Sequence, residues 1–287
     1  MIEVLGLGAG ATVQDLGRVG YAALGVPRAG AFDPGAAARA NRLVGNRESA
    51  ATIEIVLGGL ALRVDRPATV ALVGAPVPLR CEPSVSGLAW GAPVTLPAGT
   101  VLRLGAPARG LRSWLAVRGG IDAPSTLGSR STDTLGGLGP APLRVGDRLR
   151  VGADIDAGIA AVDGGADWLA DPSAAVEVAP GPRADWVDAD SLSWLWTAVW
   201  TVRPDSNRVG VRLDGPRLRW TRDEQLPSEG VLPGAIQIPP DGRPIVFGPD
   251  APTTGGYPVV GVVTAPGLAL LAQTRPGDVV RLAPRRG

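Results

Sequence analysis

The frequent interruption of short apolar stretches by glycine and proline is the feature of this sequence that most limits its fold. Glycine occurs 41 times and proline 28 times in 287 residues, and neither follows a period. Between them, apolar residues alternate with other residues, as in 52–57, 60–64 and 68–73. A period of two predicts short β-strands, and the glycines and prolines predict the turns that join them. We therefore expect a mainly β protein.

Only two segments carry clear helix signals. Asp33-Pro34 combines an N-cap with proline at the first helical position, and Gly45-Asn46 is a suitable left-handed stop, which together predict a helix over 34–44. A second helix is expected from about 188 to 199. Its apolar residues recur at helical spacing and are expected to face the core: Leu192, Leu195, Trp196 and Val199.

The composition is that of an ordinary globular protein, with 45% hydrophobic and 19% charged residues. The chain is long enough for two lobes. Residues 153–174 are rich in alanine, glycine and aspartate with weak periodicity, which favours a linker or surface excursion there. We expect an N-terminal β-rich lobe over 1–152 and a C-terminal lobe over 175–287, with few and short helices.

Two residue types are missing, and their absence excludes several mechanisms. All 28 basic residues are arginine, and there is no histidine. Without lysine the chain cannot form a Schiff base, a P-loop or a covalent biotin linkage. Without histidine it has no Ser-His-Asp triad and no imidazole ligand for a metal. Cys81 is the only cysteine, so no intrachain disulfide can form, and we expect no metal site.

The charge balance and the N-terminus indicate where such a chain works. A net charge of +1 gives no electrostatic case for binding nucleic acid or anionic lipid. The N-terminal residues lack the basic region of a signal peptide, and no apolar run is long enough to cross a bilayer. We expect a cytoplasmic protein without membrane contact.

Four polar segments flanked by glycine or proline are candidates for chemistry: 12–18, 128–133, 204–213 and 228–258. Glycine lets backbone N–H groups approach a ligand, and arginine presents a planar fork that matches a carboxylate or phosphate. The alternative interpretation is tight turns that aspartate and threonine side chains cap. The run Thr253–Tyr257 is the strongest candidate for function, because it places two hydroxyls, two glycines and a phenol in a row.

The expected site centres on the fourth segment. Gln237 alternates with Ile236 and Ile238, so a strand would point its amide away from the core and toward a cleft. We expect three catalytic residues: Gln237, Thr254 and Tyr257. Substrate- or nucleotide-binding residues are expected around them and in the other polar segments: Arg208, Arg212, Thr253, Gly255, Gly256, Arg130, Asp15 and Arg18.

The same segments resemble a known family. The resemblance begins with Thr12–Arg18, Gly30–Pro34 and Leu43–Asn46, and it continues in order through Glu54, Leu127–Asp133 and the third and fourth polar segments. Its members are described as allophanate hydrolase subunit 2, the C subunit of 5-oxoprolinase, antagonist of a sporulation-kinase inhibitor, or biotin-dependent carboxyltransferase-like protein. One departure lies at 207–213, where an Asp-Arg-Met-Gly-Tyr-Arg-Leu run common in the family reads Asn-Arg-Val-Gly-Val-Arg-Leu.

The resemblance implies a mainly β architecture with a cyclophilin-like barrel. It also implies a partner of the B type, also called subunit 1, and in many bacteria an additional A-type subunit. The complex it implies hydrolyses 5-oxo-L-proline to L-glutamate with ATP as co-substrate, and this is the function we expect. Two alternatives stay open: a carboxyltransferase-type subunit for urea or a related amide, and a regulatory binding partner of a subunit 1-type kinase inhibitor.

Overall fold

The computed structural model describes residues 1–160 and 175–285, which form two compact units. Unit 1 contains Met1–Arg18, Asp33–Asp133 and residues 137–160, and unit 2 contains Val19–Phe32, Thr134–Gly136 and residues 175–285. Most of the predicted linker, 161–174, lies outside the described residues, so the predicted lobe limits stay a prediction. The sequence carries no signal that separates 19–32 and 134–136 from their neighbours.

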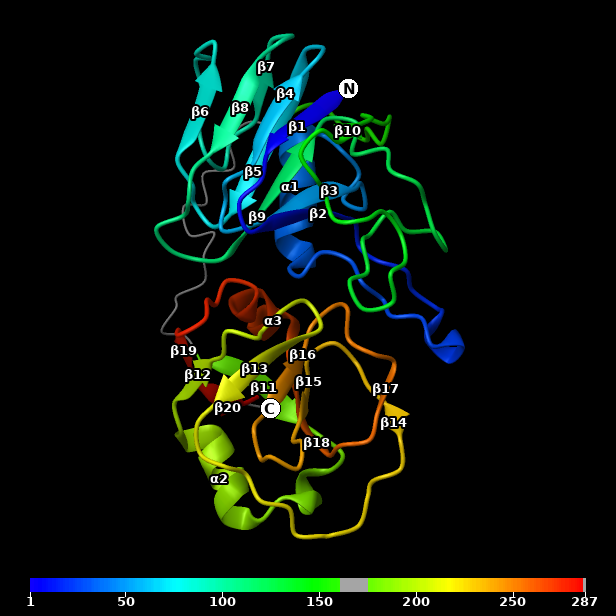
Figure 1. Cartoon of the computed structure of the whole chain (residues 1–287), viewed down its shortest axis with the longest axis vertical. Helices are drawn as coiled ribbons and strands as arrows, with labels where there is room; N and C mark the ends of the chain where they lie inside the picture. The colour runs from blue at the N-terminus through cyan, green and yellow to red at the C-terminus, as the bar shows by residue number, and fades with distance from the viewer. Residues whose placement is uncertain (161–174, 286–287) are drawn as a thin grey trace. The chain divides into compact units, whose positions relative to one another are not determined.

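Unit 1 is built on two five-stranded antiparallel sheets. The first sheet has the order β10 (Arg148–Leu149), β1 (Ile2–Gly6), β4 (Ala61–Val64), β8 (Val101–Leu104), β6 (Leu79–Glu82). The second has the order β2 (Gly10–Gln14), β3 (Thr52–Val56), β9 (Arg112–Val117), β5 (Ala68–Gly74), β7 (Val94–Leu96). Figure 1 labels these strands in the part of the chain that carries the N-terminus.

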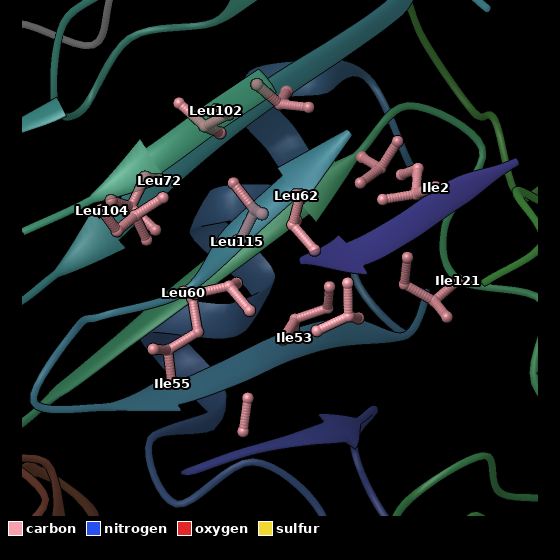
Figure 2. Close-up of a cluster of buried hydrophobic side chains, with 14 of the residues drawn as sticks. Ile2, Ile53, Ile55, Leu60, Leu62, Leu72, Leu102, Leu104, Leu115 and Ile121 are labelled. Atoms are coloured by element: carbon pink, nitrogen blue, oxygen red, sulfur yellow. The ribbon is translucent and has the colours of Figure 1, made fainter. Parts of the chain in front are cut away.

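The alternation of apolar residues places one face of each sheet in a shared core. Figure 2 shows Leu62 and Leu102 of the first sheet gathered with Ile53 and Leu115 of the second. All four side chains are almost completely buried. Burying a side chain of this size contributes roughly 1.5–3 kcal/mol, so this layer supplies much of the stability of unit 1.

Helix α1 (Pro34–Val44) covers the other face of the second sheet and packs mainly on β5 and β9. The Asp33 carboxylate accepts a hydrogen bond from the Ala36 backbone N–H at 3.0 Å, and Gly45 ends the helix with φ of 73°. The predicted helix over 34–44 is confirmed. The covered face also buries the Glu54 carboxylate, which accepts a hydrogen bond from Trp114 Nε1 at 3.0 Å.

Unit 2 is built on an eight-stranded sheet that nearly closes into a barrel. Its order is β19 (Val279–Val280), β12 (Trp200–Val202), β13 (Gly210–Asp214), β16 (Ile245–Phe247), β15 (Ala235–Gln237), β18 (Val259–Val263), β11 (Val176–Pro180), β20 (Leu282–Pro284). The two edge strands, β19 and β20, are separated in sequence by Arg281 alone. A sheet with consecutive strands at its opposite edges has to curl round on itself, which confirms the predicted mainly β fold with a barrel.

Short helices and a small ribbon complete unit 2. Helix α2 (Ala189–Thr197) confirms the helix expected over about 188–199, although only part of its apolar stripe is covered: Leu195 is fully buried and Val199 is exposed. Helix α3 (Ala265–Leu271) was not predicted. Two 3-10 turns, η1 (Ala22–Leu24) and η2 (Ala184–Trp186), and the ribbon of β14 (Glu229–Gly230) with β17 (Thr254–Gly255) make up the rest.

None of the helices within residues 1–160 and 175–285 has the length and apolar character needed to cross a membrane.

Candidate functional site

The strand register of unit 2 aligns three side chains on one face of the barrel sheet. Arg212 on β13 pairs with Ile245 on β16, and Ile245 pairs with Gln237 on β15. Directly opposed residues of neighbouring strands project to the same side of a sheet. Two residues that the sequence analysis placed in one site, Gln237 and Arg212, therefore do share a face.

A small pocket opens at the Arg212 end of this row. We call it the arginine pocket, and its volume is about 250 Å³. It is lined by three guanidinium groups, a carboxylate, a phenol and apolar side chains: Arg203, Arg212, Arg243, Asp241, Tyr257, Pro239, Pro244 and Ile245. Of the predicted site residues, Arg212 and Tyr257 are brought together here.

The guanidinium groups of the arginine pocket are shared with nearby carboxylates. Asp205 accepts two hydrogen bonds from Arg203, at 3.1 and 3.0 Å, and lies 3.6 Å from Arg212 Nε. Arg243 Nε lies 3.1 Å from Asp214. Each guanidinium carries five N–H donors, so these contacts leave donors for a ligand. A small carboxylate matches such a fork in shape and charge.

A larger pocket of about 660 Å³ adjoins the first, and the two share Asp241 and Tyr257. We call it the aromatic pocket. Two rings, three guanidinium groups and three carboxylates line it together with Gly256 and other residues: Trp220, Tyr257, Arg217, Arg219, Arg222, Asp223, Glu224 and Asp241. The rings of Trp220 and Tyr257 lie 6.4 Å apart at 55°, and Trp220 Nε1 donates a hydrogen bond to the Ile238 carbonyl at 3.1 Å.

Gln237 is buried, rather than facing an open cleft as the sequence suggested. Its amide Nε2 donates a hydrogen bond to the Tyr257 carbonyl at 3.1 Å. Gly255 passes so close that a Cβ there would lie 2.4 Å from Gln237 Nε2. The Gln237 amide therefore lies behind the Gly255–Tyr257 backbone and fixes the segment that carries the phenol.

The Thr253–Thr254 pair lies at the start of this segment. Thr254 is exposed in β17 and pairs with Gly230, and the Thr253 carbonyl accepts a hydrogen bond from the Val231 N–H at 3.0 Å. On the facing strand, Glu229 forms a two-point ion pair with Arg183. The hydrogen bond from Arg183 holds the pKa of Glu229 below its ordinary value. The Thr254 side chain lines neither of the two pockets.

Arg208 lies apart from both pockets in a buried ion pair. Its Nε and Nη2 donate to the two carboxylate oxygens of Asp250, each at 2.9 Å, and Nη2 also donates to the Gly30 carbonyl at 2.5 Å. The same carboxylate accepts hydrogen bonds from the N–H and the hydroxyl of Thr134. This cluster fastens residues 30 and 134 to the rest of unit 2, which is a structural role.

The remaining predicted residues, Asp15, Arg18 and Arg130, come together in unit 1. The Asp15 carboxylate accepts hydrogen bonds from the Ser129 and Ser131 hydroxyls, both at 2.6 Å, and from the Arg130 backbone N–H at 2.6 Å. Arg18 is buried and donates to the Ser131 carbonyl at 2.5 Å. Hydrogen bonds from Asp15 and Arg18 thus hold the loop over 126–133 in place. The ligand-binding role expected for Asp15, Arg18 and Arg130 stays a prediction.

Several pocket residues were not among the predicted site residues: Asp241 and Arg243 lie within the fourth polar segment, whereas Arg203 and Trp220 lie outside all four segments. Arg203 and Trp220 are distant from Tyr257 in the sequence, and folding brings them into the pockets that Tyr257 lines. The alternation of arginine in Arg217-Leu218-Arg219 was the one available signal. Among the described residues, no group of three or more Asp, Glu, Cys or His side chains could hold a metal ion.

Comparison with known proteins agrees with this fold and shows the family. The family model described as "Carboxyltransferase domain, subdomain A and B" matches residues 24–284, and the chain belongs to this family. It is 38% identical to the C subunit of 5-oxoprolinase from Escherichia coli (strain K12), over 98% of this chain and 90% of that protein.

Two further comparisons are with another curated protein and with a solved structure. The chain is 32% identical to the C subunit of 5-oxoprolinase from Haemophilus influenzae, over 98% of this chain and 90% of that protein. The crystal structure of Kluyveromyces lactis urea carboxylase superposes with a TM-score of 0.91 at 30% identity. That match covers 99% of this chain but 27% of the urea carboxylase chain, so the chain corresponds to about a quarter of that enzyme.

Proposed function

We propose that this chain is one subunit of a heteromeric, ATP-dependent amidohydrolase that opens 5-oxo-L-proline to L-glutamate. The observation that carries the proposal is the 38% identity to the C subunit of a 5-oxoprolinase over nearly the whole of both chains. The arginine pocket supports it independently. Its volume of about 250 Å³ suits a small molecule, and its guanidinium groups suit the substrate carboxylate.

In this proposal Arg212 and Arg203 hold the carboxylate of 5-oxoproline, and Tyr257 faces the lactam. The phenol donates a hydrogen bond to the lactam oxygen, while Gln237 holds the Tyr257 backbone in place. Thr254 lies at the exposed end of the ribbon, outside both pockets, where it can contact the partner chain. Hydrogen bonds aimed at an oxygen on which charge develops are typically the largest contribution to such catalysis.

ATP is the co-substrate because the lactam is a stable amide. Transfer of the γ-phosphoryl group to the lactam oxygen releases ADP and converts that oxygen into a leaving group. Water then adds to the carbon, the C–N bond breaks and the ring nitrogen takes up a proton, which leaves glutamate with a phosphorylated side-chain carboxyl. A second water hydrolyses this acyl phosphate, so that glutamate and phosphate are released. The chain has no lysine or histidine to move these protons, so carboxylates or a partner protein supply the acid and base.

The proposed partners are a B-type protein, also called subunit 1, and an A-type protein, in the cytoplasm. The test is reconstitution of this chain with both partners and measurement of glutamate formed from 5-oxoproline with and without ATP. The chain alone is expected to release no glutamate. Glutamate formation by the isolated chain, or by the two partners without it, contradicts the proposal.

A carboxyltransferase-type role is the second candidate, and the TM-score of 0.91 with urea carboxylase favours it. In this role the biotin has to be covalently attached to another protein, because this chain has no lysine to which it could be linked. The two roles differ in a direct assay. Transfer of carboxyl from carboxybiotin to urea, without glutamate formation from 5-oxoproline, would select the second.

A further inference from the structure

We propose that the aromatic pocket binds the base and phosphates of an adenine nucleotide, so that this chain holds the ATP of the complex. This inference takes the identity of the nucleotide, ATP, from the proposed function. What is new is the location of the nucleotide site, which lies in unit 2 between Trp220 and Tyr257.

The pocket has the size and the surfaces that a nucleotide needs. Its volume of about 660 Å³ falls within the range of roughly 300–1,000 Å³ typical of small-molecule sites. The tilted pair of Trp220 and Tyr257 gives it an aromatic wall. A nucleotide base can stack on such a wall, and this stacking does not depend on which hydrogen-bonding groups the base carries. Arginine side chains add attraction to the phosphates.

The aromatic wall is held in place before a ligand arrives. Trp220 donates to the Ile238 carbonyl and meets the Trp186 ring edge to face, with centroids 6.0 Å apart at 84°. The backbone on the other side is fixed by the hydrogen bond from Gln237 to the Tyr257 carbonyl. A pre-ordered site loses little side-chain entropy on binding, which favours affinity.

Three guanidinium groups stand at the rim, and three carboxylates line the same pocket: Asp223, Glu224 and Asp241. Arg217 donates to the Asp241 carbonyl at 2.8 Å, and its side chain is about half exposed. Arg222 lies over the Trp186 ring at 5.1 Å and pairs with Asp185. Arg219 pairs with Asp188 at 3.0 Å. Each guanidinium keeps further N–H groups that can donate hydrogen bonds to phosphate oxygens.

The position of the pocket explains why a nucleotide would be bound here. The aromatic and arginine pockets share Tyr257 and Asp241. A nucleotide in the aromatic pocket and a substrate in the arginine pocket would therefore both lie against Tyr257. That proximity is what phosphoryl transfer to the lactam oxygen requires.

The test is calorimetric titration of the full chain, without its partners, with three probes: the non-hydrolysable ATP analogue AMP-PNP, adenosine and tripolyphosphate. We expect saturable binding of AMP-PNP and weaker binding of the two fragments. Tyr257→Leu should weaken AMP-PNP and adenosine about tenfold, which corresponds to about 1.4 kcal/mol. Arg217→Gln should weaken AMP-PNP and tripolyphosphate but not adenosine.

Two controls separate the site from general effects. Tyr21→Leu removes the chain's only other tyrosine and should leave binding unchanged, as should Arg148→Gln on the surface of unit 1. Trp220→Leu provides a second test of the wall, with a melting curve to show that the variant folds. Absence of AMP-PNP binding to the wild-type chain overturns the inference, and so does undiminished binding in both Tyr257→Leu and folded Trp220→Leu.

This test is independent of the proposed function. If the reconstituted complex makes glutamate but the chain binds no nucleotide, the nucleotide site is wrong and the function stands. If the chain binds AMP-PNP at Tyr257 but the complex makes no glutamate, the site stands and the substrate is another.

Discussion

Neutralising Asp250 should destabilise unit 2 far more than neutralising any exposed carboxylate. The Asp250 side chain has no exposed surface, and Arg208 is buried with it. The carboxylate accepts two hydrogen bonds from Arg208 and two from Thr134. In Asp250→Asn the amide NH₂ would face hydrogen-bond donors, and the buried guanidinium of Arg208 would lose the negative charge of Asp250.

Removing one partner of a buried ion pair typically costs about 3–5 kcal/mol, because the other charge stays buried and uncompensated. We expect a loss of that size for Asp250→Asn. The matched control is Asp205→Asn, which breaks a two-point contact with Arg203 of similar length at a half-exposed site. Exposed pairs of this kind contribute roughly 0–1 kcal/mol.

Urea unfolding followed by tryptophan fluorescence measures both variants, because unit 2 holds Trp186, Trp194, Trp196, Trp200 and Trp220. The single variants Arg208→Met and Asp250→Leu and the double variant that combines them form a double-mutant cycle. The double variant should lose less stability than the sum of the single variants, since neither charge is then left alone. A loss below about 1 kcal/mol in Asp250→Asn would refute the structural role and return Arg208 to the ligand-binding candidates.

The remaining predictions concern the site, the cap of α2 and the absence of lysine. Gly255→Ala should displace the Gln237 amide and lower turnover of the complex, whereas Gly230→Ala on the facing strand meets no atom within 4 Å and should not. Tyr257→Phe, assayed in the complex beside a melting curve, should cost roughly 2–4 kcal/mol of transition-state stabilisation with little change in melting temperature, and full activity in this variant would move the site elsewhere. The backbone hydrogen bond from Ser191 lowers the pKa of the Asp188 carboxyl. The Asp188 cap therefore stabilises helix α2 at pH values above the ordinary carboxyl pKa of about 3.9, and this stabilisation is lost as the pH falls through the lowered pKa. Asp188→Ala should therefore lower the melting temperature at neutral pH and lose that effect in strong acid; an equal effect at both would contradict the assignment. Intact mass should never show covalent biotin on this chain, because no lysine can carry it.

Helix α1 could be predicted from the sequence because the signals at its two ends are local. The Asp33 cap and the Gly45 stop act within a few residues of the chain, and α1 has the predicted bounds. Helix α3 was missed because Pro266 and Gly267 look like turn residues, although proline at the first turn is compatible with a helix that Thr264 caps.

The site could be predicted only in part, for a physical reason. The fourth polar segment was recognised from its hydroxyls and glycines, and Tyr257 does stand between the two pockets. Gln237 was expected to face outward because it alternates with isoleucine. In a nearly closed sheet under a close backbone segment, however, both faces of that strand are covered. Arg203 and Trp220 join the site from positions far from Tyr257 in the sequence, which no local pattern encodes.

The central claim is that this chain completes an ATP-dependent complex acting on 5-oxoproline. It is tested most directly by combining the purified chain with its A-type and B-type partners and following glutamate and ADP together. The account predicts glutamate and ADP in equal amounts only when all three proteins, 5-oxoproline and ATP are present. Equal glutamate formation when this chain is left out, or none when all components are present, would contradict it.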